Sequence, residues 1–457
     1  TRLDGSGDFT PGPWPEGSDF FWPGQNATDG RRLFLRLSGT DVGGSTSLKY
    51  DYNQAGEYIF EVGSAMSISR RRFDFRNFRY SSVGEAPLAR TPPEVLFLNE
   101  NRADNWELTE RTGREASFDS RDDLFAIYGQ TSLQLHPRIR FFGGVRIEAF
   151  RQFLLPGTGD IPFPARQTSI VERYDLSYLP AGAVTIKVYD DSEDDGDQLG
   201  RMNLRMGYSQ TVARPRGPEL SRTLRPDFIN NQLIAGEPNI RIATIQNLDI
   251  RWEWFLGGTD VIAASVFAKI FDAPIEFVIR DQNQTVSFQN VESARNVGFE
   301  LEAKMGLGRL TEVLEGFQAG ANFTYVNSRA VLPDDLALIA TNAERPLQYQ
   351  APFLVNASLG YDPDGSDFGV YLFYLVSGAF ITQVGNNPIP DTRRLPFHNL
   401  DLLVAWDIAE EWGLKFRVRN LLNDRYEEVF EFRGARACFR CNDPGVDVSL
   451  SITYRNR

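Results

Sequence analysis

The sequence has almost no histidine, little cysteine and no long apolar run, and each shortage excludes a class of protein. No stretch of 18 or more apolar residues occurs in the 457-residue chain, so no membrane-spanning helix is expected. Histidine occurs only as His136, in a predicted turn, and His398, at the start of a predicted strand. Catalysis by a barrel hydrolase needs a histidine or a nucleophile–base pair. We therefore expect no enzyme, no catalytic residue and no cofactor.

Basic residues are also fewer than acidic ones. The chain has 48 Lys and Arg against 61 Asp and Glu, which gives a net charge of -13 and a pI of about 4.9. Because phosphate binding needs Lys and Arg clustered on one face, no nucleic-acid partner is expected. The acidic runs at 4–8 and 190–197 do not complete the twelve-residue loop, ending in Glu, that calcium sites use. We expect solvated turns there and no metal site.

The chain does contain a regular alternation of apolar and polar residues over segments of about ten residues. At the C-terminus one parity is apolar, namely Val446, Val448, Leu450, Ile452 and Tyr454, and the other is Asp447, Ser449, Ser451 and Thr453. A soluble sandwich gives a similar alternation, but tilted strands of this length suit a membrane-spanning barrel. We therefore expect the apolar parity to face lipid and the polar parity to face a lumen.

The segments form a meander of about fifteen or sixteen strands, including those at 45–53, 260–280, 285–306 and 413–432. Short turns alternate with long polar loops at 73–116, 212–242, 332–347 and 383–395. Short periplasmic turns and long outer loops are typical of outer-membrane barrels, and the strand count places the C-terminus in the periplasm. We expect residues 1–44 to be an N-terminal loop or the start of a fragment, and 45–457 to be the transmembrane β-barrel.

Several strings occur in an order that resembles the barrel half of TonB-dependent outer-membrane receptors, over most of residues 45–457. They are GGVRIE at 143–148, YSQTVARPRGPEL at 208–220, GEPNI at 236–240, NLDIRWEWF at 247–255, SVFAKIFDAPIE at 265–276, NVESARNVGFELEA at 290–303, ERPLQYQAPFLVNASLGY at 344–361, LDLLVAW at 400–406 and RNLLNDRYEEV at 419–429. The resemblance lies in the order of the strings, since no single string is specific.

The resemblance implies an all-β fold, an antiparallel transmembrane outer-membrane β-barrel. It implies a receptor that takes up a scarce solute, such as a siderophore, cobalamin, glycan or peptide, by energised transport. The implied partners are outer-membrane lipid and the TonB complex, and a surface lipoprotein is a further candidate. A ligand would first meet aromatic residues of the outer loops, among them Trp106, Phe228 and Phe380.

The sequence departs from this family in two features. We recognise no plug domain and no energy-coupling box, and the strand count is below the roughly 22 strands of plugged transporters. We therefore expect a fragment of a 22-stranded barrel, with the plug domain not in this chain. Two alternatives stay open, a passive porin-like channel and a structural or assembly barrel of the outer membrane.

Charged residues on the polar parity are the candidates for lumen-facing positions. They are Arg146, Glu148, Asp249, Arg251, Glu253, Glu300, Glu302, Arg417 and Arg419. Such residues can bind a substrate, but a plugged barrel also needs polar groups that hold its plug, and we favour this structural role. The sequence identifies no substrate-binding residue.

Cys438 and Cys441, in the string CFRC, are the two cysteines of the chain. In an oxidising compartment they are expected to close a disulfide in the final outer loop. Free thiols are the alternative. A redox or metal-binding role is less favoured, because a reactive CxxC pair needs a helix N-terminus, and here Pro444, Gly445 and the last strand follow.

Overall fold

The computed structural model describes residues 2–3, 9–10, 31–52, 57–82, 106–110, 112, 117–157, 170–190, 200–222, 225–227, 232–280, 285–432 and 435–455. They belong to two units, which are described separately. The larger unit comprises 41–68, 122–153 and 171–457, and the smaller comprises 1–40, 69–121 and 154–170. In the described ranges no helix is long and apolar enough to cross a bilayer.

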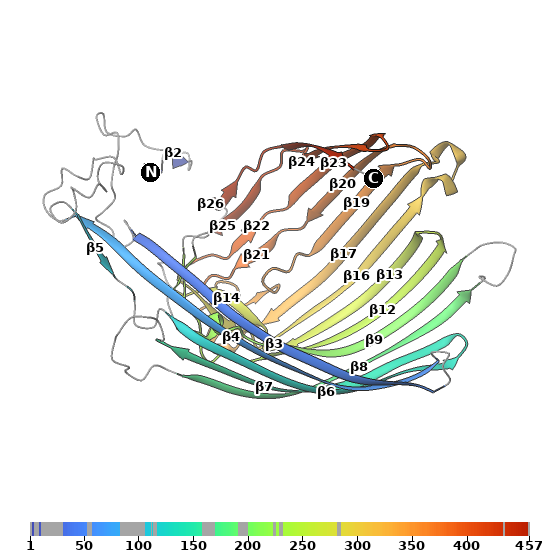
Figure 1. The fold of residues 1–457 in the computed structure, drawn as a ribbon. Helices are drawn as coiled ribbons and strands as arrows, with labels where there is room; N and C mark the ends of the chain where they lie inside the picture. Colours follow the sequence, from blue (N-terminus) through green and yellow to red (C-terminus); the bar gives the residue numbers. More distant parts are fainter. Residues whose placement is uncertain are drawn as a thin grey trace. The chain divides into compact units, whose positions relative to one another are not determined.

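The larger unit is built on one antiparallel sheet of long strands, and the order of hydrogen-bonded neighbours is that of a barrel. Figure 1 shows β12, β13, β16 and β17 side by side, in the order that the pairings give. The strands are β3 Arg31–Asp51, β4 Tyr58–Ser82, β6 Phe118–His136, β7 Ile139–Pro156, β8 Val171–Asp190, β9 Arg201–Ala213, β12 Ala243–Gly257, β13 Asp260–Asp272, β16 Ser293–Gly306, β17 Phe317–Val331, β19 Phe353–Tyr361, β20 Phe368–Ser377, β23 Phe397–Ala409, β24 Trp412–Arg419 and β27 Asp447–Tyr454.

Two short strands, β5 Trp106–Glu110 and β18 Glu344–Arg345, also belong to this order, but the long strands on either side of each pair directly with one another. Without these two, the described part of the chain contributes fifteen strands to the order, within the expected range. The expected fold class, an antiparallel all-β outer-membrane barrel, is confirmed.

The predicted alternation is visible in the exposure of the side chains. On β12, Leu248 and Ile250 are 43% and 47% exposed, and on β27 Leu450 and Ile452 are 61% and 63% exposed. Exposed apolar side chains at every second position form a continuous apolar face across neighbouring strands, as a lipid-facing barrel wall requires. We call this the apolar face and the opposite one the polar face.

Several of the expected strands are each broken into two, among them 260–280, 285–306 and 413–432. The segment 413–432 forms β24 and then β25 Tyr426–Phe432, because Asn420 and Asn423 adopt positive φ angles of 51° and 53°. Asparagine tolerates this left-handed conformation better than other side chains. Likewise 260–280 splits into β13 and β14 Ile275–Ile279 at Ala273, which has φ 53°, and 285–306 splits into β15 Val286–Asn290 and β16.

Another expected boundary also differs. The strand predicted at 45–53 is β3, which starts at Arg31 and therefore reaches into the segment expected to be an N-terminal loop. Leu33, Leu35 and Leu37 alternate with Phe34 and Arg36, and this period-2 pattern extends the strand toward the N-terminus. The expected domain boundary at 44/45 stays a prediction.

Beyond the long strands, the larger unit contains two four-stranded sheets, formed partly by the predicted outer loops and partly by the ends of predicted strands. The first has the order β10-β11-β15-β14, with β10 Arg225–Asp227 and β11 Gln232–Ile234. The second, β21-β22-β25-β26, has β21 Phe380–Gln383, β22 Thr392–Arg394 and β26 Ala435–Asn442. A bridge between Val278 and Val384 connects the two sheets, and both residues are buried. We call these two sheets the loop sheets.

The smaller unit contains the strand ends 31–40 and 69–82 and the strand β5. Phe73 and Phe118 stack with their ring centroids 5.2 Å apart, and both side chains are buried. Arg72 forms a two-pronged ion pair with Asp119, and Arg76 forms one with Glu110. The unit is thus held by a small aromatic core and exposed ion pairs.

Candidate functional site

Two clusters of ion pairs contain five of the predicted charges: Arg146 and Glu148 on β7, Arg251 and Glu253 on β12, and Glu302 on β16. In the first, Glu148 accepts hydrogen bonds from Arg146 Nε at 2.7 Å and from Arg214 Nη1 at 2.8 Å. Arg214 also lies 3.4 Å from Asp175 and donates to Ser177. Two guanidinium groups and two carboxylates therefore compensate one another, and the Glu148 side chain is only 9% exposed.

The second cluster spans four neighbouring strands on the polar face. Arg251 donates from Nε to Glu253 at 2.9 Å and from Nη2 to Glu302 at 2.7 Å. Arg205 donates to the other oxygen of Glu253 at 2.8 Å. This cluster also contains two positive and two negative groups, so it braces β9, β12, β13 and β16 without an excess of charge.

The other predicted positions do not join these clusters. Glu300 is the cross-strand partner of Ser265 and Thr324, and Arg417 lies between Leu403 and Ser449. Arg419 lies opposite Asp447. Among the residues that the structure describes, no carboxylate approaches Arg417 or Arg419 to ion-pair distance, and both are exposed.

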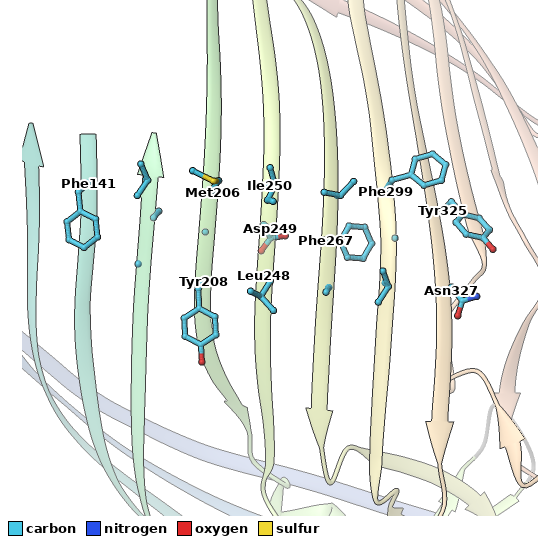
Figure 2. Close-up of a pocket in the computed structure, with 18 residues that line it drawn as sticks. Phe141, Met206, Tyr208, Leu248, Asp249, Ile250, Phe267, Phe299, Tyr325 and Asn327 are labelled. Atoms are coloured by element: carbon cyan, nitrogen blue, oxygen red, sulfur yellow. The ribbon is translucent and has the colours of Figure 1, made fainter. Parts of the chain in front are cut away.

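A shallow groove of about 890 Å³ crosses β8, β9, β12, β13, β16 and β17, and Asp249 is one of its lining residues. Figure 2 shows its two rows of side chains, one with Met206 and Ile250 and the other with Tyr208 and Leu248. Between the rows lie positions of the opposite parity, including Gly207 and Gly298. Because Leu248 and Ile250 belong to the apolar face, we assign this groove to the lipid-facing surface and not to a solute site.

A second hollow, of about 680 Å³, lies over β17, β19 and β20 beside Glu302. Asn356 Nδ2 donates to Asn322 Oδ1 at 2.8 Å, and Tyr371 stacks nearly parallel to Phe373, with an interplanar angle of 13°. Glu302 and Asn322 are cross-strand partners, so this hollow opens on the polar face.

The loop sheets contain a buried core on the predicted outer side. Ile279, Val286, Phe288 and Ile381 are buried there, and Arg345 forms a buried ion pair with Glu276. Gln232 and Gln383, 151 residues apart, exchange two amide hydrogen bonds. Such long-range pairing between loops gives a pre-organised surface.

The three aromatic residues predicted in the outer loops lie in different parts of the chain. Phe380 is in β21, and its ring lies 6.3 Å from that of Tyr349. Trp106 begins β5, and Phe228 lies outside the described residues. Cys438 and Cys441 are joined by a disulfide on β26, in the second loop sheet.

Several of the residues that organise these sites were not predicted from the sequence. Arg205 and Arg214 lie on β9 and just after it, and their alternation with apolar neighbours was the available signal. Glu276 and Arg345 gave no signal, since they lie in the short strands β14 and β18, 69 residues apart. In the described part of the chain no cluster of three His, Cys, Asp or Glu residues is arranged to hold a metal ion.

A family model described as TonB dependent receptor-like, beta-barrel matches residues 1–421. A curated relative from Haemophilus influenzae, a probable hemoglobin and hemoglobin-haptoglobin-binding protein, is 25% identical over 214 residues. This match covers 44% of the present chain and 19% of the relative.

Solved structures with the same fold include the copper transporter OprC, with a TM-score of 0.59, 16% identity, and coverage of 92% of this chain and 57% of that chain. The unliganded ferric citrate transporter FecA gives a TM-score of 0.60 at 13% identity, with 93% and 56% covered. The siderophore receptor PiuA from Acinetobacter baumannii gives 0.59 at 12% identity, with 92% and 56% covered. The chain thus spans about half the length of these structures, and the likeness shows the fold.

Proposed function

The chain belongs to the TonB-dependent receptor-like β-barrel family, and from this premise we propose that it forms the wall and outer loops of a receptor that imports a scarce solute by energised transport. The family consists of outer-membrane transport receptors and not of enzymes. The solute would be a siderophore, cobalamin, glycan or peptide. The names of the similar proteins refer to hemoglobin, ferric citrate and copper, so the range of candidate solutes stays wide.

The observation that carries the proposal, beside family membership, is the pair of loop sheets. A channel for passive diffusion needs no buried core in its loops, whereas a receptor must hold its ligand contacts in place before the ligand arrives. In this chain Val278 and Val384 join the two sheets, and the buried Gln232–Gln383 pair is between β11 and β21.

We also propose partners for this chain and an orientation of its C-terminus in the outer membrane. Outer-membrane lipid would cover the apolar face, and the C-terminus would be periplasmic, on the side of the short turns such as Glu410–Glu411. The TonB complex would act through a plug domain outside the present residues, and a surface lipoprotein is a further candidate partner. The paired charges around Glu148 and Arg251 would brace the wall next to such a plug.

Uptake by cells that carry the intact gene tests this proposal. Cells with and without the gene would be given a panel of labelled ferric siderophores, cyanocobalamin, oligosaccharides and short peptides, with and without a protonophore. We expect accumulation of one panel member to need both the gene and the proton-motive force. Gene-dependent influx that the protonophore leaves unchanged would indicate a porin-like channel instead. No gene-dependent influx, together with envelope assembly defects, would indicate a structural barrel.

A further inference from the structure

One face of the second loop sheet carries a continuous cross-strand row of side chains. Phe380 on β21 is the partner of Arg394 on β22, Arg394 is the partner of Glu428 on β25, and Glu428 is the partner of Arg440 on β26. Cross-strand partners point to the same face of a sheet, so one carboxylate lies between two guanidinium groups. The row therefore carries an excess of positive charge.

Arg394 forms no ion pair with the carboxylate of its cross-strand partner Glu428. Its guanidinium carbon lies 4.4 Å from the ring centroid of Tyr426, 5.6 Å from that of Phe380 and 6.0 Å from that of Phe397. Its Nε is buried without a hydrogen-bond partner, and within the described ranges no carboxylate is at ion-pair distance from this side chain.

Glu428 is already engaged by other groups. The Tyr426 hydroxyl donates to Glu428 Oε1 at 2.7 Å, and Arg440 Nη1 lies 3.8 Å from the same oxygen. Burial, together with this hydrogen bond, raises the pKa of Tyr426, so its hydroxyl stays a donor at neutral pH. The positive charge of Arg394 therefore interacts with the aromatic rings and is available to an anion that approaches from solvent.

A guanidinium stacked on aromatic rings keeps its N–H groups directed outward in its own plane. That edge matches the two oxygens of a planar carboxylate, which it can bind through two parallel hydrogen bonds. The rings around it also form an apolar border for a flat ligand. Arg394 is half-buried and the Arg440 side chain is 24% exposed, so both remain accessible.

The position of Arg440 depends on a bulge in β26. Glu428 pairs with Arg440 but Val429 pairs with Cys438, so Phe439 is the extra residue. In a regular strand, residues three apart point to opposite faces. The bulge puts Cys438 and Cys441 on the same face, where they form the disulfide, and Arg440 on the face of Arg394. The disulfide therefore holds the register that directs Arg440 toward the row.

We propose that Arg394 and Arg440, bordered by Phe380, Tyr426 and Phe397, form a binding site for a planar carboxylate, fixed in register by the Cys438–Cys441 disulfide. This inference deepens the proposed function, on which it rests, by naming an anionic substrate class for the outer loops. The aromatic border favours a conjugated or aromatic carboxylate over a small hydrated anion.

Binding of phthalate to the purified native protein in detergent, measured by isothermal titration calorimetry, tests the site without any transport. Phthalamide is the matched neutral probe. We expect phthalate to bind and phthalamide not to bind. Arg394→Gln should weaken phthalate binding about tenfold or more, and Arg394→Lys, which keeps the charge but loses the planar fork, should give an intermediate loss. Resistance to unfolding in cold detergent would verify that each variant is folded.

The matched control is Arg436→Gln, because Arg436 lies on the same strand, has an exposed side chain and is paired with Glu431. We expect it to bind phthalate as the native protein does. The Cys438→Ser/Cys441→Ser variant should lose part of the affinity, to the same extent as Arg440→Gln. Absence of phthalate binding, equal binding of phthalamide, or an equal loss in Arg436→Gln would overturn the inference. If Arg394-dependent binding is found but no energised uptake, the site stands and the proposed receptor function fails.

Discussion

Arg345 and Glu276 form a two-pronged ion pair in which the side chains are only 1% and 3% exposed. Arg345 Nη1 and Nη2 lie 3.0 and 2.6 Å from the two oxygens of Glu276, and the backbone N–H of Gln348 donates to the same carboxylate. The pair joins β18 of the barrel order to β14 of the first loop sheet. This ion pair therefore couples the first loop sheet to the wall.

Replacing only one partner of this pair should release the loop sheet. Arg345→Met leaves the carboxylate of Glu276 buried without its counter-ion, which costs about 3–5 kcal/mol. We expect proteinase K to cleave the outer loops of this variant much faster in intact cells. The double variant Arg345→Met/Glu276→Leu should recover most of the resistance, because no buried charge is left.

The control for this variant is Arg329→Met, which breaks an ion pair with Glu344 whose side chains are 49% and 76% exposed. We expect a change below about 1 kcal/mol. Equal proteolysis of Arg345→Met and Arg329→Met would contradict the role that we give to the buried pair.

The barrel strands were predictable from the sequence because their signal is local. Alternation at period 2, such as that from Val446 to Tyr454, needs no knowledge of distant residues. The turn at Asn420 was not predicted, because 413–432 keeps an apolar pattern on both sides of a left-handed residue. The pattern alone cannot reveal such a break.

The loop sheets were beyond prediction for a different reason. β10, β11 and β22 have three residues each, too few for a periodic signal, and their partners lie far away in the sequence. The partner of Glu148 illustrates the same limit, since Arg214 is 66 residues away. The period-2 pattern predicted that Glu148 lies on the polar face. Only the folded chain shows which cation pairs with its carboxylate.

The assignment of the two faces leads to a prediction at Leu450. Leu450→Arg puts a charge on the apolar face, where we expect a loss of about 2–4 kcal/mol near the bilayer midplane. Its neighbour Ser451 points to the polar face, so Ser451→Arg is the matched control and should cost little. Folding in lipid vesicles, followed by urea titration, gives both values. A similar cost at both positions would mean that β27 is not oriented as we describe.

Arg214 should be the residue on which the first charge cluster depends. Its guanidinium bonds Glu148, Asp175 and Ser177 and lies 4.7 Å from the ring centroid of Phe150. Arg214→Ala removes one of the two guanidinium donors to the buried Glu148 carboxylate and the donor to the buried Ser177 hydroxyl, and we expect a loss of about 1–3 kcal/mol in urea unfolding.

The comparison for Arg214 is Arg151→Ala, in which an exposed ion pair with Glu172 is removed. The two side chains are 50% and 41% exposed, so the loss should stay below about 1 kcal/mol. A larger loss in Arg151→Ala than in Arg214→Ala would show that burial does not set the strength of these pairs.

Asn420 should tolerate glycine better than alanine. Its φ of 51° costs an ordinary residue about 1–2 kcal/mol, and glycine nothing. Its amide also donates to the backbone oxygens of Asp424 and Gly445 and accepts from the Asp424 N–H, so both variants lose these hydrogen bonds. We expect Asn420→Ala to lose about 2–3 kcal/mol in urea unfolding and Asn420→Gly about half of that.

Asn423 provides the control for this turn, because it has a similar φ of 53° but its side chain is exposed. Asn423→Gly should therefore leave the free energy of unfolding nearly unchanged. Asn423→Ala should lower it only by the cost of the positive φ. If alanine and glycine cost the same at 420, the hydrogen bonds alone would hold the turn. The break between β24 and β25, and with it the placement of Tyr426 and Glu428 in the loop sheet, would then depend on side-chain contacts and not on backbone conformation.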